Sequence, residues 1–122
     1  SAPHWRARAL GTDQDYSDKA NGQMCLLLQV ETKAGYENLD EILAVDDVDG
    51  IFFGAADLAA SYGLLGQPNH PSIVSAIEAG LKKTRAAGKA GGVLCGDKAV
   101  VQRYYEAGAR FIAVGVDALL LA

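Results

Sequence analysis

The chain has 122 residues, 50% of them hydrophobic, and a formal net charge of −4 at pH 7. This length and apolar fraction suit one globular domain with a buried core, and the acidic balance offers no basic surface for nucleic acid. No apolar run reaches the roughly 18 residues that span a bilayer, the first residues show no signal-peptide pattern, and two cysteines do not make a disulfide framework. We therefore expect a cytoplasmic protein with neither nucleic acid nor membrane as partner.

After residues 1–23, expected to form a short helix and a long loop, predicted strands and helices alternate along the chain. Apolar runs predict strands over residues 24–30, 51–54, 90–95 and 111–115. Helical spacing and capping residues predict helices over 34–45, from Pro71 to Gly88, and from a cap at Asp97 to Gly108. Residues 55–69 are expected to be a loop, and Asp117 is expected to begin another helix.

This alternation predicts an α/β fold made of βαβ units around a parallel sheet. Because a complete (β/α)8 barrel needs about 250 residues, the chain would supply about half of one. Within the second helix, Glu78 and Lys82 are spaced for an outward ion pair. Cys25 and Cys95 are interpreted as buried apolar residues, and only one of the adjacent Tyr104 and Tyr105 can face the core.

Two acidic residues follow predicted strands. Glu31 closes the run that begins at Met24, and Asp57 comes shortly after strand 51–54. Because α/β folds place their ligands at the carboxyl ends of parallel strands, this pair predicts an oxygen-rich site suited to Mg²⁺ or Mn²⁺. Each residue has a structural alternative: Glu31 as a charge favoured near a helix N-terminus, and Asp57 as the cap of a short helix over 58–62.

Four segments in this order carry a resemblance: Gln29-Val30-Glu31-Thr32, Gly54-Ala55-Ala56-Asp57-Leu58, Gly88-Lys89-Ala90-Gly91-Gly92 and Val114-Gly115-Val116-Asp117. Together they resemble the HpcH/HpaI family of class II pyruvate aldolases, over essentially the whole chain. The resemblance implies a TIM (β/α)8 barrel, with residues 1–122 as its C-terminal half, strands five to eight. It implies a lyase that reversibly converts 4-hydroxy-2-oxo acids into an aldehyde and pyruvate, or a hydroxylated analogue, through a metal-stabilised enolate.

The resemblance also implies the partners and the site. The cofactor would be a divalent ion, Mg²⁺, Mn²⁺ or Co²⁺. The partners would be the 2-oxo acid and aldehyde substrates, the N-terminal half of the same barrel, and further copies in a dimer-based hexamer. The metal ligands fall on Glu31 and Asp57. The substrate-binding positions fall on Gln29, Gly54, Ala56, Asp57 and Leu94, and the amides of Ala56 and Asp57 would hold the oxo-acid carboxylate. Gln29 could instead be a satisfied polar group, and Leu94 a core residue first.

The sequence departs from the family in two ways. The family loop reads Gly-Pro-Ala-Asp-Leu-Ser, whereas Ala55 and Ala59 replace its proline and serine, which bears on the preferred donor. The family's histidine base and its arginine have no match in this sequence, since neither His4 nor His70 fits the histidine position and no arginine fits the other. No catalytic residue is therefore expected in this segment, and both would come from the N-terminal half.

An alternative function is a non-catalytic half-barrel with an assembly role, because half a barrel exposes strand edges. A third possibility is a phosphate-binding half-barrel. It is disfavoured because the sequence has no glycine-rich run at a helix N-terminus with a lysine nearby.

Overall fold

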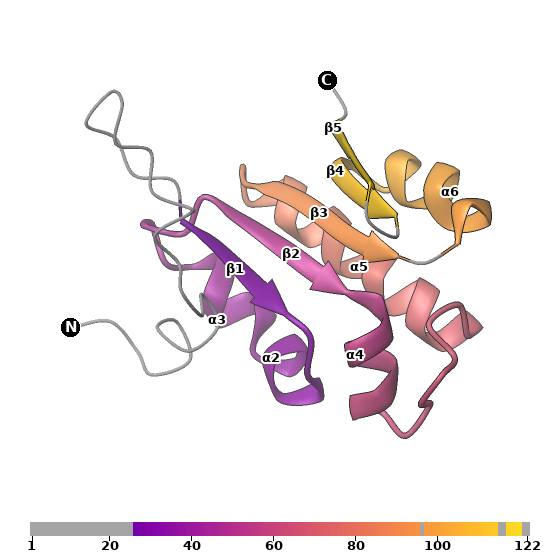
Figure 1. Cartoon of the computed structure of the whole chain (residues 1–122). Coiled ribbons are helices and arrows are strands. Elements are labelled where there is room, and N and C mark those ends of the chain that lie inside the picture. Colours follow the sequence, from indigo (N-terminus) through magenta and orange to yellow (C-terminus); the bar gives the residue numbers. More distant parts are fainter. Residues whose placement is uncertain (1–25, 96, 115–116, 121–122) are drawn as a thin grey trace.

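The computed structural model describes residues 26–95, 97–114 and 117–120, and in this part of the chain it contains one five-stranded sheet (Figure 1). The strand order is β1-β2-β3-β4-β5. The first four strands are parallel: β1 (Leu27–Val30), β2 (Gly50–Gly54), β3 (Ala90–Cys95) and β4 (Ala109–Val114). The predicted α/β fold with a parallel sheet is confirmed.

The described helices connect successive strands. They are α2 (Lys33–Glu37), α3 (Leu39–Leu43), α4 (Ala55–Ser61), α5 (Pro71–Ala86), the 3-10 turn η2 (Lys98–Val100) and α6 (Val101–Glu106). In Figure 1 the helices α3 and α5 lie behind the sheet, and the arrowheads of β1, β2 and β3 point toward the same edge. No helix among the described residues is long and apolar enough to cross a membrane.

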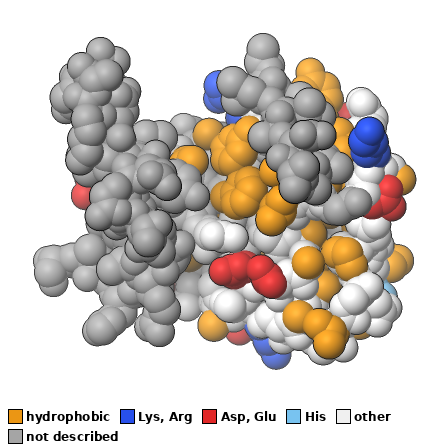
Figure 2. Space-filling model, in the orientation of Figure 1, with side chains coloured by type: hydrophobic (Ala, Val, Ile, Leu, Met, Phe, Trp, Pro, Cys, Tyr) orange, Lys and Arg blue, Asp and Glu red, His pale blue; other side chains and the backbone are white. Residues whose placement is uncertain are grey.

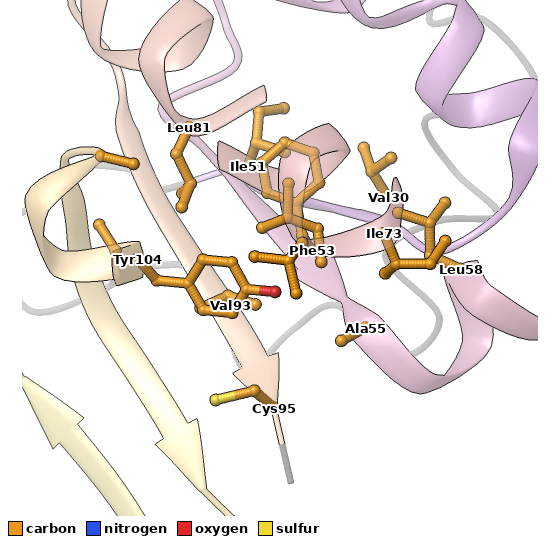
Figure 3. Packing of buried hydrophobic residues seen from close by; sticks show 14 of the residues in the cluster. Val30, Ile51, Phe53, Ala55, Leu58, Ile73, Leu81, Val93, Cys95 and Tyr104 are labelled. Atoms are coloured by element: carbon orange, nitrogen blue, oxygen red, sulfur yellow. The ribbon is translucent and has the colours of Figure 1, made fainter. Parts of the chain in front are cut away.

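The two faces of the sheet differ because side chains alternate along each strand. Val30, Phe53 and Val93 face the helices and are almost completely buried. They belong to a core that includes Ile51, Leu58, Ile73, Leu81 and Tyr104, drawn in Figure 3. The opposite face is lined by partly exposed apolar side chains, and no described helix covers it. Figure 2 shows hydrophobic side chains gathered on the face turned to the viewer.

The helix ends predicted at Pro71, Gly88, Asp97 and Gly108 are confirmed, and the structure adds His70 as a cap. The His70 ring accepts a hydrogen bond from the Ser72 amide (3.1 Å), with Pro71 as the first residue of α5. Asp97 accepts a hydrogen bond from the Ala99 amide (2.9 Å). Gly88 and Gly108, which follow α5 and α6, have φ angles of 78° and 110° that favour glycine.

Side-chain packing on α5 and α6 confirms one prediction and corrects another. Tyr104 is fully buried while Tyr105 is 48% exposed, so only one of them faces the core. The expected ion pair within α5 is not the one that forms. Glu78 instead accepts two hydrogen bonds from Arg103 of α6, at 2.8 and 2.9 Å. The arginine of this neighbouring helix can bind a carboxylate in a bidentate way.

Two helix predictions were wrong. The single helix predicted over 34–45 is two short helices that meet at Asn38, whose φ and ψ are −95° and 12°. Gly35 and Asn38 are weak helix formers, so this break has a local cause. Residues 55–69, predicted to be a loop, begin with helix α4, because the run of alanines around Asp57 favours helix.

The C-terminal prediction was also wrong. Residues 117–120 form β5 (Asp117–Leu120), antiparallel to β4, and not the start of a helix. A short apolar run is compatible with either structure, and pairing with β4 satisfies backbone groups of both strands. At the other end of the chain, His4 and Cys25, with the first part of the predicted strand 24–30, lie outside the described residues.

Candidate functional site

Three predicted site residues converge at the carboxyl ends of β1 and β2. These strands are parallel neighbours, with Val30 opposite Phe53, so Glu31 leaves β1 beside Gly54. A Cβ atom built on Gly54 would lie 3.4 Å from Cβ of Glu31, 3.8 Å from Nε2 of Gln29 and 3.9 Å from Oδ2 of Asp57. Acidic side chains lie near the centre of the face shown in Figure 2, beside the hydrophobic patch.

Each carboxylate lies at a junction between a strand and a helix. Thr32 is the N-cap of α2, and its Oγ1 accepts a hydrogen bond from the Gly35 amide (3.0 Å); Glu31 therefore precedes the cap. Gly54 occupies the N-cap position of α4, which places Asp57 within the first turn. The alternative interpretation of Asp57 as the cap of a helix over 58–62 is therefore wrong. Both side chains project at the strand ends, where α/β folds bind ligands.

The electrostatics of the pair are those of two carboxylates that face each other. The pKa of Glu31 is raised, first by burial and then by a hydrogen bond and the negative charge of Asp57. Among the described residues, no lysine or arginine forms an ion pair with either carboxylate. A cation placed between the two would relieve this repulsion.

The donor set fits a cation that keeps part of its water shell. In the described ranges no group of three or more histidine, cysteine or acidic side chains is arranged to hold a metal. Mg²⁺ is commonly bound through one or two carboxylates, with water and substrate oxygens completing an octahedron. Glu31 and Asp57 fit that mode, and they do not form a closed protein cage.

Gln29 lies on the same side of β1 as Glu31, two residues away. Its Nε2 donates a long hydrogen bond to Oε2 of Glu31, at 3.4 Å, so its amide group turns toward the carboxylate pair.

Leu94 lies on β3, directly opposite Gly54 of β2. Its side chain is 37% exposed, so the interpretation of Leu94 as a core residue first is wrong. Ala56 is exposed in the first turn of α4. The structure thus brings every predicted site residue to one edge of the sheet.

One contact at this edge was not predicted from the sequence. The backbone amide of Lys33 donates a hydrogen bond to Oγ of Ser61 (2.7 Å), joining the start of α2 to the end of α4. The Lys33 ammonium also lies 5.9 Å from the centre of the Tyr62 ring. Ser61 follows Asp57 by four residues, a spacing that places both on one helix face. The four-residue spacing of Asp57 and Ser61 indicates a shared helix face only once residues 55–61 are recognised as helical.

Comparison with known proteins gives a consistent result. The HpcH/HpaI aldolase/citrate lyase family model matches residues 5–122. The chain is 50% identical over 117 residues to a hydroxypyruvate/pyruvate aldolase of Roseovarius nubinhibens, covering 96% of this chain and 46% of the relative. It is 51% identical over 108 residues to a 4-hydroxy-2-oxo-heptane-1,7-dioate aldolase of Shigella sonnei, covering 88% and 41%.

A solved structure agrees with these relatives. The crystal structure of a HpcH/Hpal aldolase/citrate lyase family protein from Burkholderia cenocepacia J2315 matches with a TM-score of 0.70 and 40% identity, over 93% of this chain and 45% of that one. The chain thus spans less than half the length of each of these three proteins.

Proposed function

This chain belongs to the HpcH/HpaI aldolase/citrate lyase family, and on that premise we propose that residues 1–122 are the C-terminal half of a (β/α)8 aldolase barrel. The four parallel strands would be strands five to eight. Their neighbours in the sheet are their neighbours in the sequence, and the described helices cover one face only, as in a barrel wall. The partly exposed apolar face would then point into the barrel.

The proposed reaction is the reversible cleavage of a 4-hydroxy-2-oxo acid into an aldehyde and pyruvate, or a hydroxylated analogue of pyruvate. The names of the two relatives, at about 50% identity, support a lyase of this kind. The convergence of the Glu31 and Asp57 carboxylates on Gly54 is the observation that connects the proposal to particular residues.

Glu31 and Asp57 would hold the divalent ion, Mg²⁺ or Mn²⁺, with Co²⁺ as a third candidate. When bound, such an ion supplies Lewis-acid chemistry, drawing electron density from the 2-oxo group of the substrate. The two carboxylates fix the place of the charge, and the amide of Gln29 turns toward it. The amides of Ala56 and Asp57 would bind the substrate carboxylate, because Gly54 has no side chain with which to cap them.

Leu94 would form an apolar wall of the substrate pocket, since its side chain is exposed beside Gly54. The general base and the group that neutralises the enolate oxygen would come from the N-terminal half of the barrel. The proposal also includes a dimer-based hexamer, which the family resemblance implies, and a cytoplasmic location, which the low cysteine content favours.

The test is made in the full-length protein that contains this segment. We expect Asp57→Asn, which keeps the shape of the side chain and removes its charge, to abolish Mn²⁺ binding and the release of pyruvate together. Glu106→Gln on α6 is the matched control for a lost carboxylate outside the site. Calorimetric titration of Mn²⁺ and an assay of pyruvate release measure the two effects. A metal-free Asp57→Asn variant with full activity would refute the proposal.

A further inference from the structure

Two interactions join the segment after β1 to the end of α4. Lys33 is the first residue of α2, where a backbone amide has no acceptor within its own helix. Here that amide donates to Oγ of Ser61, the last residue of α4, at 2.7 Å. The Lys33 ammonium lies over the ring of Tyr62, the C-cap residue that follows α4. The orphan donor of one helix is thus satisfied by a side chain of another.

These interactions join the same two elements that carry the carboxylates. Glu31 precedes Lys33 by two residues, and Asp57 precedes Ser61 by one helical turn, on the same face of α4. Two carboxylates repel each other, and a contact that holds α4 against the segment after β1 offsets this repulsion. The Lys33–Ser61 hydrogen bond is such a contact, placed next to the pair.

We propose that Ser61 is a positioning residue for the cation site, because its hydroxyl group fixes α4 against the segment after β1 and so sets the spacing of Glu31 and Asp57. This inference rests on the proposed function, in which these two carboxylates hold a divalent ion. Ser61 itself touches neither the ion nor the substrate. Its effect is on how well the two carboxylates are arranged before the ion binds.

The first test measures Mn²⁺ affinity in the full-length protein by calorimetric titration. Because a hydrogen bond between exposed residues contributes modestly, we expect Ser61→Ala to weaken Mn²⁺ binding about threefold to tenfold. Ser61→Thr keeps a hydroxyl group and should retain most of the affinity. Ser75→Ala on α5 is the matched control: the same change, at an exposed helical serine with no side-chain hydrogen bond among the described residues.

The second test removes the donor in place of the acceptor. Lys33 is at the first helical position, which proline tolerates, and the preceding Thr32 has the extended φ and ψ of −127° and 158° that a following proline requires. Lys33→Pro therefore deletes the amide donor without breaking α2. Lys33→Ala deletes only the ammonium. We expect Lys33→Pro to weaken Mn²⁺ binding beyond Lys33→Ala, and the two variants to have equal effects in the presence of Ser61→Ala.

Glu31→Ala and Asp57→Ala separate the two proposals. If these variants bind Mn²⁺ as well as the unmodified protein does, the proposed function fails. If they lose binding while Ser61→Ala and Lys33→Pro retain full affinity, the positioning role is overturned and the proposed function stands. A threefold to tenfold loss in Ser61→Ala that Ser61→Thr restores supports the role. Circular dichroism at the titration temperature checks folding, and Lys33→Pro provides the test if Ser61→Ala does not fold.

Discussion

At the scale of single residues, the candidate site brings together two acidic side chains that have no basic partner among the described residues. Burial, and then the hydrogen bond and the negative charge of Asp57, raise the pKa of Glu31. An arrangement that costs stability in the absence of a ligand is typical of functional sites. Burial likewise raises the pKa of Tyr104, in the core of the fold.

The raised pKa of Glu31 predicts a pH-dependent cost. Because the pKa of Glu31 is higher in the folded than in the unfolded state, its charged form destabilises the metal-free protein at neutral pH. This cost shrinks as the pH falls below the folded-state pKa and is gone below the unfolded-state pKa. We expect Glu31→Gln to raise the unfolding temperature of the metal-free protein at pH 7, with the difference shrinking toward pH 4. Thermal unfolding at several pH values measures it. At pH 7, Mn²⁺ should stabilise only the unmodified protein, and an equal effect on both would contradict the assignment.

The hydroxyl group of Tyr104 is buried and has no hydrogen-bond partner in the described part of the chain. Figure 3 shows this ring beside Val93, between α6 and the sheet. Because a buried hydroxyl without a partner loses its hydration, we expect Tyr104→Phe to keep or increase the free energy of unfolding, by up to about 1–3 kcal/mol. Urea denaturation measures it, with Tyr105→Phe as the exposed control. A clear loss of stability would show that the hydroxyl group is bonded.

At the scale of elements, the sheet face opposite the helices depends on a glycine. Phe52, Gly92 and Phe111 are neighbours across β2, β3 and β4. The two rings are stacked, with centroids 5.4 Å apart and planes 8° from parallel. A Cβ atom on Gly92 would lie only 2.1 Å from the Phe111 ring. The glycine therefore allows aromatic rings from two strands that are not adjacent to meet above the strand between them.

We expect Gly92→Ala to separate the Phe52–Phe111 stack and to lower the free energy of unfolding by about 1–3 kcal/mol, as overpacking does. Denaturant titration of the full-length protein measures the change. In a Phe111→Ala background the ring nearest to the added methyl group is removed, so Gly92→Ala should then cost less. Equal costs in the two backgrounds would show that the ring contact is not the cause.

At the scale of the whole molecule, the described sheet is asymmetric. One face packs on helices, while the other presents partly exposed apolar side chains, including Leu94 and Phe111. The chain also spans less than half the length of its relatives. Exposed apolar patches of this kind mark contact surfaces, and the proposed barrel would bury this one. The alternative, a non-catalytic half-barrel with an assembly role, would use the same surface.

Size-exclusion chromatography of the 122-residue chain tests this surface. We expect the chain alone to self-associate or aggregate, and to elute as a defined complex when mixed with a separately produced N-terminal half of the barrel. Pyruvate release by that complex would favour the aldolase, whereas a stable complex without activity would favour the assembly role. A well-folded monomer would contradict both.

The sequence alone determined the alternation of strands and helices and the place of the two carboxylates. Both follow from local rules: apolar runs predict buried strands, glycine and capping residues predict helix ends, and a residue after a parallel strand lies at the ligand-binding edge. The convergence of Gln29, Glu31 and Asp57 around Gly54 agrees with that reasoning, while their chemical roles stay predictions.

Only the tertiary structure decided the pairing of β5 with β4, the exposure of Leu94, the partner of Glu78 and the hydrogen bond between Lys33 and Ser61. Each depends on which distant segment packs nearby. A short apolar run such as 118–121 suits helix or strand equally, and an orphan helix amide can be satisfied by any hydroxyl within reach. Local preference leaves these choices open, and the packing of the whole fold makes them.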